Sequence, residues 1–289
     1  MKSKLVTFGC SFTDWQWPTW ADWMGHYYDD HEKLAKGGTG NRAIFHTLIS
    51  YLGSKSSFEN EQIVIQWTSA IREDRYDKEN NPTEYRPGGN VTNNPFYDKE
   101  YIEQHYSTLQ NTVETVNYIF TAKKLLDSLN IEYVMTFMLD PRIGLFLGEP
   151  GYKLNNVRVE ELKLIKAELK KLNLLIDDKF TDKCLTMHQL DEPRTVYSFY
   201  DIITGEIQKE GHPSPYQHYS FFKKYIQPKV ISKSFTPNAD ILKCVQDWEE
   251  YAKIKKSFNE KEHLQPKSWP SNKRYLNGSE IQPNQQKLI

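Results

Sequence analysis

Two short stretches of the chain contain residue types that can perform nucleophilic catalysis together. Ser11 lies in the sequence Gly-Cys-Ser-Phe-Thr, directly after a short apolar run that predicts a buried strand. His212 lies far along the chain in a Gly- and Pro-rich loop, with Glu210 two residues before it. A serine hydroxyl is a poor nucleophile until a base removes its proton, and an acid must orient that base. Ser11, His212 and Glu210 could therefore supply a nucleophile, a base and an acid.

Each stretch also has an ordinary structural interpretation. Ser11 can belong to a plain strand-to-helix turn in which it caps a helix, and His212 can be an incidental residue of a surface turn. The pattern lacks the second glycine of the Gly-x-Ser-x-Gly nucleophile elbow, which disfavours an ordinary α/β-hydrolase. Cys10 is an alternative nucleophile, and Asp201 or a backbone carbonyl is an alternative partner for His212.

Strand and helix patterns alternate along most of the chain. Short apolar runs predict buried strands, and apolar residues three or four apart predict helices between them. This alternation favours a mostly parallel sheet with helices on both faces, so we expect a flavodoxin-like three-layer α/β/α sandwich. The predicted strands are 5–8, 63–65 and 131–138, and the predicted helices lie within 12–24, after loop 37–41, within 101–130 as one helix or two, at 157–177 and at 241–254.

Composition suggests boundaries and some details. We expect one domain over residues 1–235, with a polar loop insert at 76–98 as a candidate lid, and a helical or extended C-terminal extension at 236–289. Pro18 fits the first turn of an early helix, and Thr39 or Asn41 can cap the helix that follows the glycine-rich loop.

Charge and cysteine content exclude several classes. The chain has 289 residues, with 37 Lys and Arg against 38 Asp and Glu, which argues against a general nucleic-acid binder and against attraction to anionic membranes. Apolar runs are too short for a transmembrane helix or a secretory signal. The 3 cysteines are widely spaced, so neither a disulfide framework nor a zinc site is expected. We therefore expect a cytoplasmic or virion-associated protein without nucleic-acid or membrane partners.

Four motifs, taken in their order, resemble those of the SGNH (GDSL-like) hydrolase family. Gly9–Thr13 is similar to the first block, with Ser11 as nucleophile, and Glu210–Ser214 is similar to the last block, with base and acid. Lys36–Asn41 resembles the second block, and Gln66–Ser69 stands where the third block follows a strand. The resemblance implies a serine esterase that works through an acyl-enzyme without metal or organic cofactor. It also implies small acyl groups, such as acetyl on a glycan, as substrates.

The resemblance further implies an oxyanion hole. Backbone N–H groups of Ser11 and Gly38 are the expected donors, with Gly40 as the next candidate. The third block lacks the family's Asn, so Ser69, Thr68 or a water would have to donate instead. Losing one such donor typically costs about 10²–10³ in rate. Cys10 also replaces the Asp of the family's namesake motif, and Glu210 is one residue nearer to the base than the usual Asp.

Other residues near these blocks are candidates for substrate contacts. Trp15 is the tryptophan closest to Ser11 and can stack on a sugar ring, whereas the other tryptophans of this segment are expected in the core. Arg72 and Arg75, which stand beside Glu73 and Asp74, either hold a substrate carboxylate or phosphate or form a solvated charge cluster. His218 is expected at the start of the next helix, in a packing or capping role. The remaining weak candidates for substrate binding are Gly40, Asn41, Trp67 and Thr68.

Two other functions fit the same residues. An O-acyltransferase would let a sugar hydroxyl intercept the acyl-enzyme, and a dry lid made by residues 76–98 would favour it. A structural or carbohydrate-binding protein, such as a viral accessory protein, would keep the fold with little activity. The missing Asn and the Glu in place of Asp favour the second alternative.

Overall fold

The structure is a computed structural model of the chain. It describes residues 3–77, 81–86, 89, 91, 97–138, 184–186, 212–230 and 239–254, and for 76–77, 81–86, 108–109, 184–186 and 253–254 it describes the backbone alone. Several predictions fall on other residues and stay predictions. They concern the helix at 157–177, Asp201, Glu210 and the part of the C-terminal extension that follows residue 254.

Within the described residues, five parallel strands form the main sheet. Across the sheet the strands run in the order β2-β1-β3-β6-β7, and every neighbouring pair is parallel. Counted in chain order this is the 2-1-3-4-5 arrangement of flavodoxin-like folds, which confirms the predicted fold class. The strands are β1 (Lys4–Gly9), β2 (Asp30–Ala35), β3 (Glu61–Trp67), β6 (Glu132–Phe137) and β7 (Cys184–Thr186).

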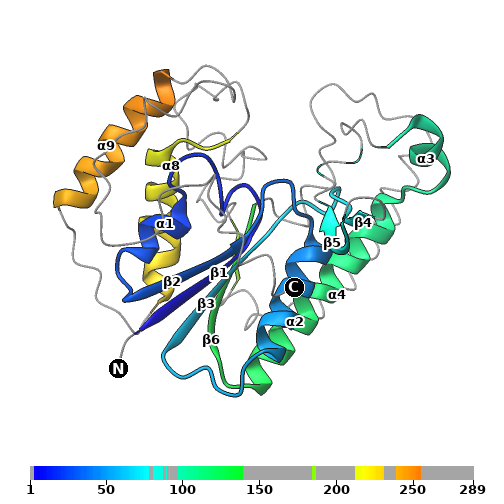
Figure 1. The fold of residues 1–289 in the computed structure, drawn as a ribbon, viewed down its shortest axis with the longest axis horizontal. Coiled ribbons are helices and arrows are strands. Elements are labelled where there is room, and N and C mark those ends of the chain that lie inside the picture. The colour runs from blue at the N-terminus through cyan, green and yellow to red at the C-terminus, as the bar shows by residue number, and fades with distance from the viewer. Residues whose placement is uncertain are drawn as a thin grey trace.

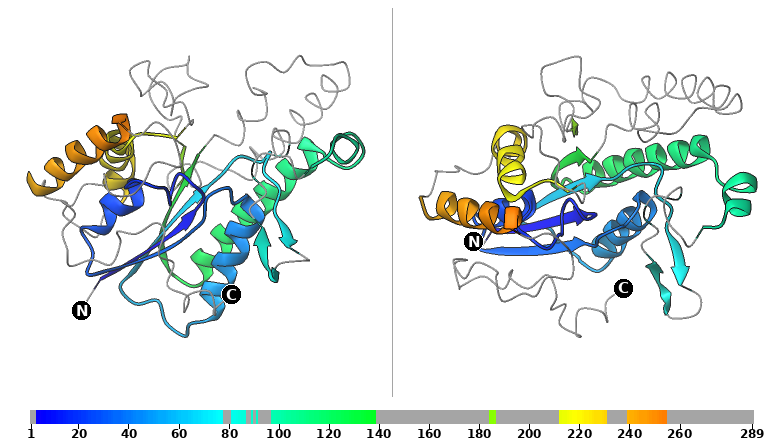
Figure 2. Two further views of the ribbon diagram at one scale, coloured as in Figure 1. Left: turned by 45° about the horizontal axis from the view of Figure 1, so that its top comes forward. Right: turned by 90° about the horizontal axis from the view of Figure 1, so that it is seen from above.

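Helices cover both faces of this sheet. Helices α2 (Asn41–Gly53) and α4 (Thr108–Ser128) lie on one side, and α1 (Trp20–Gly25), α8 (Pro215–Phe221) and α9 (Ala239–Ile254) lie on the other (Figures 1 and 2). A π-helical turn and a 3₁₀ turn continue α8 as η2 (Phe222–Ile226) and η3 (Gln227–Lys229). The α9 helix confirms the helix predicted at 241–254.

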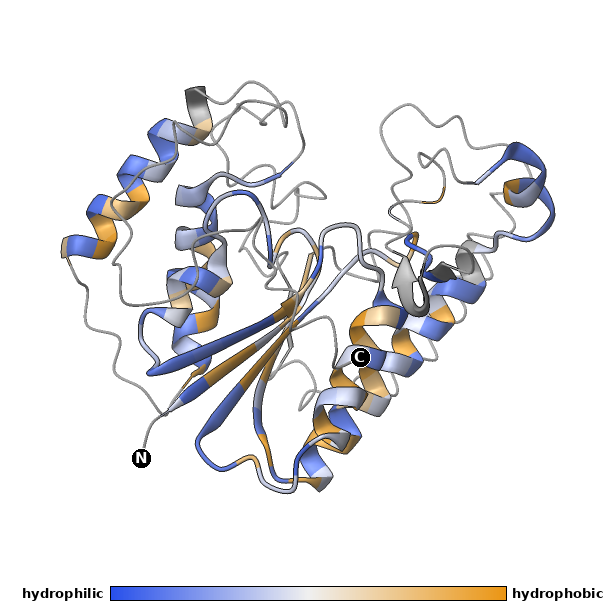
Figure 3. Ribbon diagram, viewed as in Figure 1, coloured by the Kyte–Doolittle hydropathy of each residue, from blue (hydrophilic) through white to orange (hydrophobic). Residues whose placement is uncertain are grey.

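The α2/α4 face of the sheet is packed with apolar side chains. Because successive strand residues point to opposite faces, Val6 and Phe8 of β1 share this face with Ile63 and Ile65 of β3. Figure 3 shows orange, apolar positions along these strands and on α2 and α4. The helical partners in this cluster are Ile44, Leu48, Tyr51, Leu52, Ile119, Ala122 and Leu126.

The α1/α8/α9 face mixes apolar packing with buried polar groups. Leu5, Val64 and Val134 of the strands join a cluster with α1, α8, η2 and α9. Thr7 and Gln66 share this face, and both are buried. Gln66 Oε1 accepts hydrogen bonds from Thr13 Oγ1 (3.0 Å) and Trp20 Nε1 (3.1 Å). This face therefore joins distant segments through directed contacts as well as apolar area.

Some local expectations differ from the structure. Strand β2 was not expected, because its sequence Asp-His-Glu-Lys-Leu-Ala is not an apolar run. The prediction that Pro18 lies in the first helical turn is wrong, because α1 begins after Thr19, whose N–H donates to Asp22 Oδ2 (2.8 Å). For the segment 101–130, the expectation of two helices rather than one is confirmed, since α4 is preceded by α3 (Lys99–Gln104).

The polar insert contains regular structure. Strands β4 (Arg75–Asp77) and β5 (Asn81–Arg86) pair antiparallel as a separate two-stranded sheet, drawn in cyan in Figure 2. Beyond this hairpin, Gly89 N donates to the carbonyl of Gly38 (3.0 Å), and Val91 N donates to the carbonyl of Ile71 (3.3 Å). The insert is therefore attached to the loops that follow β2 and β3. Its role as a lid stays a prediction.

Candidate functional site

Ser11 lies in a tight turn at the carboxyl end of β1. The N–H groups of Thr13 (2.8 Å) and Asp14 (3.0 Å) both donate to the carbonyl of Cys10, which closes the turn. Ser11 is only 2% exposed. A Cβ on Gly9 would come within 2.0 Å of Thr13 Oγ1, so this close approach requires glycine. The hydrogen bond from Thr13 to Gln66 fixes the turn on β3.

The sheet topology sets Ser11 at a topological switch point. Strand β1 is flanked by β2 on one side and β3 on the other, and the connecting segments carry α1 and α2 on opposite faces. Ligands of open α/β sheets bind at the carboxyl ends of strands at such a point. The loop after β2 approaches Ser11, because a Cβ on Gly37 would lie 3.9 Å from Ser11 Cβ. Gly38 in this loop has a positive φ of 79°.

The segment after β3 is tied to the first turn of α2. Asn41 Nδ2 donates to the carbonyl of Thr68 (3.0 Å), and Thr68 N donates to Asn41 Oδ1 (2.8 Å). Asn41 Nδ2 also donates to Thr115 Oγ1 of α4 (3.1 Å). The Asn41 amide therefore bonds to both the carbonyl and the N–H of Thr68, which fixes the backbone just before Ser69.

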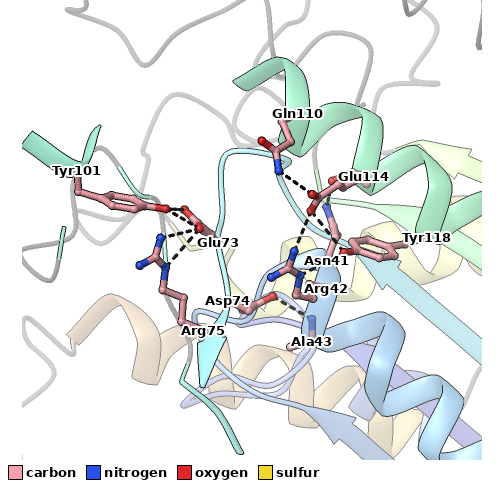
Figure 4. A network of polar contacts seen from close by, with 11 residues as sticks. Asn41, Arg42, Ala43, Glu73, Asp74, Arg75, Tyr101, Gln110, Glu114 and Tyr118 are labelled. Atoms are coloured by element: carbon pink, nitrogen blue, oxygen red, sulfur yellow. Dashed lines mark hydrogen bonds and ion pairs between the residues drawn. The ribbon is translucent and has the colours of Figure 1, made fainter. Parts of the chain in front are cut away.

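Asp74 caps α2, and the sequence interpretation missed it. Its buried carboxylate accepts from the N–H groups of Gly40 (2.7 Å) and Ala43 (2.9 Å) at the start of this helix. Figure 4 shows the bond from Ala43. The expected caps, Thr39 and Asn41, are wrong, because Gly40 is the N-cap residue and the capping oxygen comes from a distant segment. Burial raises the pKa of Asp74, against the opposing effect of these N–H groups and of nearby arginines.

The arginines near Asp74 have different partners. Arg72 Nη1 donates to the carbonyl of Thr39 (3.2 Å), so its side chain crosses the glycine-rich loop. Arg75 pairs with Glu73 (3.1 Å), and Tyr101 also donates to Glu73 (2.7 Å), as Figure 4 shows. The expected solvated cluster therefore describes Arg75 but not the buried Asp74. Whether Arg72 also holds a substrate anion stays a prediction.

The candidates after β3 differ in their surroundings. Trp67 is 0% exposed and belongs to the apolar cluster beneath α2 and α4. Thr68 Oγ1 donates to Met138 Sδ (3.5 Å), and Ser69 Oγ accepts from Ile71 N (3.3 Å). Ser69 and Ser11 follow the adjacent strands β3 and β1, so the structure brings both candidates to one edge of the sheet.

The segment that carries His212 is attached to the residues that follow Ser11. The His212 ring stacks on Trp15, with ring centroids 3.4 Å apart and 11° between planes. Trp17 Nε1 donates to the carbonyl of Pro213 (2.8 Å), and Trp23 Nε1 donates to the carbonyl of Pro215 (3.1 Å). These three tryptophans, two of them expected only as core residues, attach the segment 212–215 to the residues that follow Ser11.

Helix α8 begins directly after this segment. Ser214 is its N-cap residue, and Pro215 occupies the first turn. His218 lies inside α8 and is 0% exposed, which confirms its expected packing role. Burial, and then the charge of His212, lower the pKa of His218 to about 3, so this imidazole is neutral at physiological pH.

A charged triplet joins the sheet to α1 on the same face. Lys33 Nζ of β2 contacts Asp14 (2.9 Å) and Asp22 (3.0 Å). Burial alone would raise the pKa of Asp22, but Lys33, the Thr19 N–H and His31 together lower it. Burial would likewise lower the pKa of Lys33, but the two carboxylates raise it. The triplet connects the turn after Ser11 to α1 through an ionised lysine.

Metal-binding clusters and membrane-spanning helices are both absent from the described residues. In this part of the chain no cluster of three or more His, Cys, Asp or Glu side chains has an arrangement that could hold a metal ion. None of the helices described has the length and apolar character needed to cross a membrane.

Comparison with known proteins gives fold-level neighbours only. No protein-family model matches the chain, and no curated protein sequence matches it. Among solved structures, it is similar to a member of the lipolytic protein G-D-S-L family from Veillonella parvula, with 11% identity and a TM-score of 0.41 over 80% of this chain and 100% of that one. It is also similar to a putative lipolytic protein of the same family from Desulfitobacterium hafniense, with 12% identity and a TM-score of 0.37 over 79% of this chain and 99% of that one.

Proposed function

We propose that this protein is a serine esterase of the SGNH type, with Ser11 as nucleophile and His212 as general base. The observation that carries the proposal is the contact between two segments some 200 residues apart in the sequence, since Trp15 and Trp17 hold His212 and Pro213. Phe12, the residue after Ser11, also lies with its ring 5.4 Å from the His212 ring. Both segments meet at the carboxyl end of β1, where sheets of this order bind ligands.

The reaction would begin when His212 accepts the proton of Ser11 Oγ and the oxygen attacks the acyl carbonyl. The negative charge that develops on the carbonyl oxygen would be held by N–H groups of Ser11 and Gly38, with help from Ser69. Protonated His212 then gives its proton to the departing alcohol, which leaves an acyl-enzyme on Ser11. A water, deprotonated by His212, releases the acid and restores the serine.

The acid that orients His212 is proposed to be Glu210. A small acyl group, such as acetyl carried on a glycan, is the proposed substrate, and no metal or organic cofactor enters the chemistry. The positive φ of Gly38 supports its role, because a residue with this backbone conformation can turn its N–H toward Ser11 without the strain that a side chain would add.

The test is hydrolysis of p-nitrophenyl acetate, together with labelling by a fluorophosphonate probe. We expect turnover and labelling in the wild type, and a loss of at least about 10³-fold in Ser11→Ala. Cys10→Ala is the matched control, because it removes the neighbouring thiol and should leave labelling in place. A folded wild type with neither turnover nor labelling would overturn the proposal, and a glycan-binding array would then follow.

A further inference from the structure

The imidazole of His212 lies flat on the indole ring of Trp15. The ring centroids are 3.4 Å apart and the planes differ by 11°, so the two rings are in full van der Waals contact. Phe12 contributes a second, tilted ring at 5.4 Å and 46°. Trp15 itself is partly buried and packs against the cluster formed by α1, α8 and α9.

A flat aromatic contact acts differently on the two protonation states of a histidine. The face of an indole carries partial negative charge and attracts a cation above it, whereas a neutral imidazole gains little from that charge. The base in acyl transfer becomes an imidazolium in the transition state. An interaction made mainly with that cation therefore lowers the barrier, because it is stronger in the transition state than in the ground state.

We propose that Trp15 is a positioning residue for His212, fixing the plane of the imidazole and stabilising the imidazolium formed when Ser11 loses its proton. The inference rests on the proposed function and adds a residue to it. Trp15 follows Ser11 by four positions, so one short segment carries both the nucleophile and the surface that orients the base. Because His212 covers one face of the indole, a sugar that stacks on Trp15 as predicted would have to use the other face.

Other charged groups act on the same region. His218 of α8 is coupled electrostatically to His212, and burial with the charge of His212 lowers the pKa of His218 to about 3. Asp22 of α1 and Lys33 of β2 act on His218 with opposite signs. Substitution of Trp15 leaves all of these groups in the chain, so a change in the titration of His212 reports on the loss of the indole.

The test is an NMR titration of the His212 imidazole, assigned with His212→Gln, in wild type, Trp15→Leu and Trp15→Phe. Leucine keeps an apolar cover but removes the aromatic face, so we expect the titration midpoint to fall by about 0.5–1 pH unit, and by less with phenylalanine. Trp248→Phe is the matched control, because it alters a tryptophan of the same cluster on α9. The midpoint should not move in this control.

A second readout is the pH dependence of kcat/KM for p-nitrophenyl acetate. Because His212 must be neutral to accept a proton, the acidic limb should move to lower pH in Trp15→Leu by the same amount, while the plateau falls. Unchanged midpoints in both Trp15 variants would overturn the inference even if turnover fell, since Trp15 would then act through packing alone. A wild type without turnover would overturn the proposed function, whereas a shifted midpoint would still establish the coupling of Trp15 to His212.

Discussion

The two faces of the sheet are built with different chemistry. Toward α2 and α4 the strands present mainly apolar side chains, and leucine, isoleucine and alanine residues of these helices pack against them. Toward α1 and α8 the strands also present Thr7, Gln66 and Lys33, and the helices above contain the buried Asp22 and His218. Both candidate catalytic segments, after Ser11 and around His212, are attached on this second, polar face.

The two faces contribute differently to the stability of the fold and to the positioning of the candidate catalytic segments. Apolar packing is non-directional, so the α2/α4 face contributes free energy without selecting one geometry among similar ones. Buried hydrogen bonds and ion pairs cost free energy whenever they are broken, so they select one arrangement. We therefore expect substitutions on the apolar face to change stability alone, and substitutions on the polar face near Ser11 to change reactivity as well.

Lys33→Met should have the largest effect. It leaves the buried Asp22 carboxylate without its cation, and breaking such a pair costs about 3–5 kcal/mol of unfolding free energy. The lowered pKa of Asp22 means that its contribution is present above the unfolded-state pKa and is lost as pH falls through the folded-state value. In the variant the ionised form of Asp22 is disfavoured instead, so the loss of unfolding free energy should shrink as the pH falls. Urea unfolding at neutral pH and at pH ~4 measures this change.

The double variant Lys33→Met with Asp22→Leu is the control for this prediction. Replacing both charges with apolar groups should recover part of the stability, since no buried carboxylate is left uncompensated, whereas the Thr19 N–H loses its acceptor. A loss in Lys33→Met that is equal at both pH values would contradict the role given to Asp22.

Leu126→Ala tests the apolar face. Leu126 is fully buried on α4, and truncation of a buried leucine costs about 2–5 kcal/mol through lost transfer energy and the cavity that remains. Urea unfolding should show this loss, while the rate at which a fluorophosphonate labels Ser11 in the folded fraction stays at the wild-type value. Slower labelling would mean that the two faces are coupled.

The sequence predicted the parts of the fold whose apolar pattern is strong. Strands β1, β3 and β6 are buried on both faces and appear as apolar runs, and α9 has a clear helical pattern. Strand β2 was missed because it lies at the edge of the sheet, where charged residues are normal and no apolar run is needed. In Figure 3, β2 is mostly blue while β1 and β3 carry orange.

The candidate site was predictable only in its residue types. Ser11 and His212 stood out because a serine after a strand and a histidine in a late loop have a recognised chemical use together. Asp74 as the cap of α2 and Trp17 as a donor to Pro213 depend on contacts between distant segments. The spacing of residues along the chain does not indicate such contacts. The sequence also does not distinguish an aromatic residue that fills a core from one that holds a loop.

Gln66→Leu tests a directed contact on the polar face. It removes the acceptor shared by Thr13 and Trp20 and leaves two buried donors without this partner, at a cost of about 2–3 kcal/mol. Since Thr13 anchors the turn that carries Ser11, probe labelling should slow as well. Gln62→Leu is the matched control, because Gln62 lies on the same strand and face but bonds to the carbonyls of Ile63 and Glu132 (both 3.3 Å). It should lose stability without slower labelling, and equal labelling in both variants would refute the directed role of Gln66.

The smallest expected change in stability comes from Trp17→Phe, which removes the donor to the Pro213 carbonyl. The loss of one buried hydrogen bond predicts about 1 kcal/mol in unfolding free energy. Trp23→Phe removes the equivalent bond to Pro215 and should cost a similar amount. Pro213 adjoins His212 whereas Pro215 already lies in α8, so Trp17→Phe should slow p-nitrophenyl acetate hydrolysis more than Trp23→Phe does. Equal slowing at equal loss of stability would mean that these tryptophans support the whole layer and that neither one orients the base.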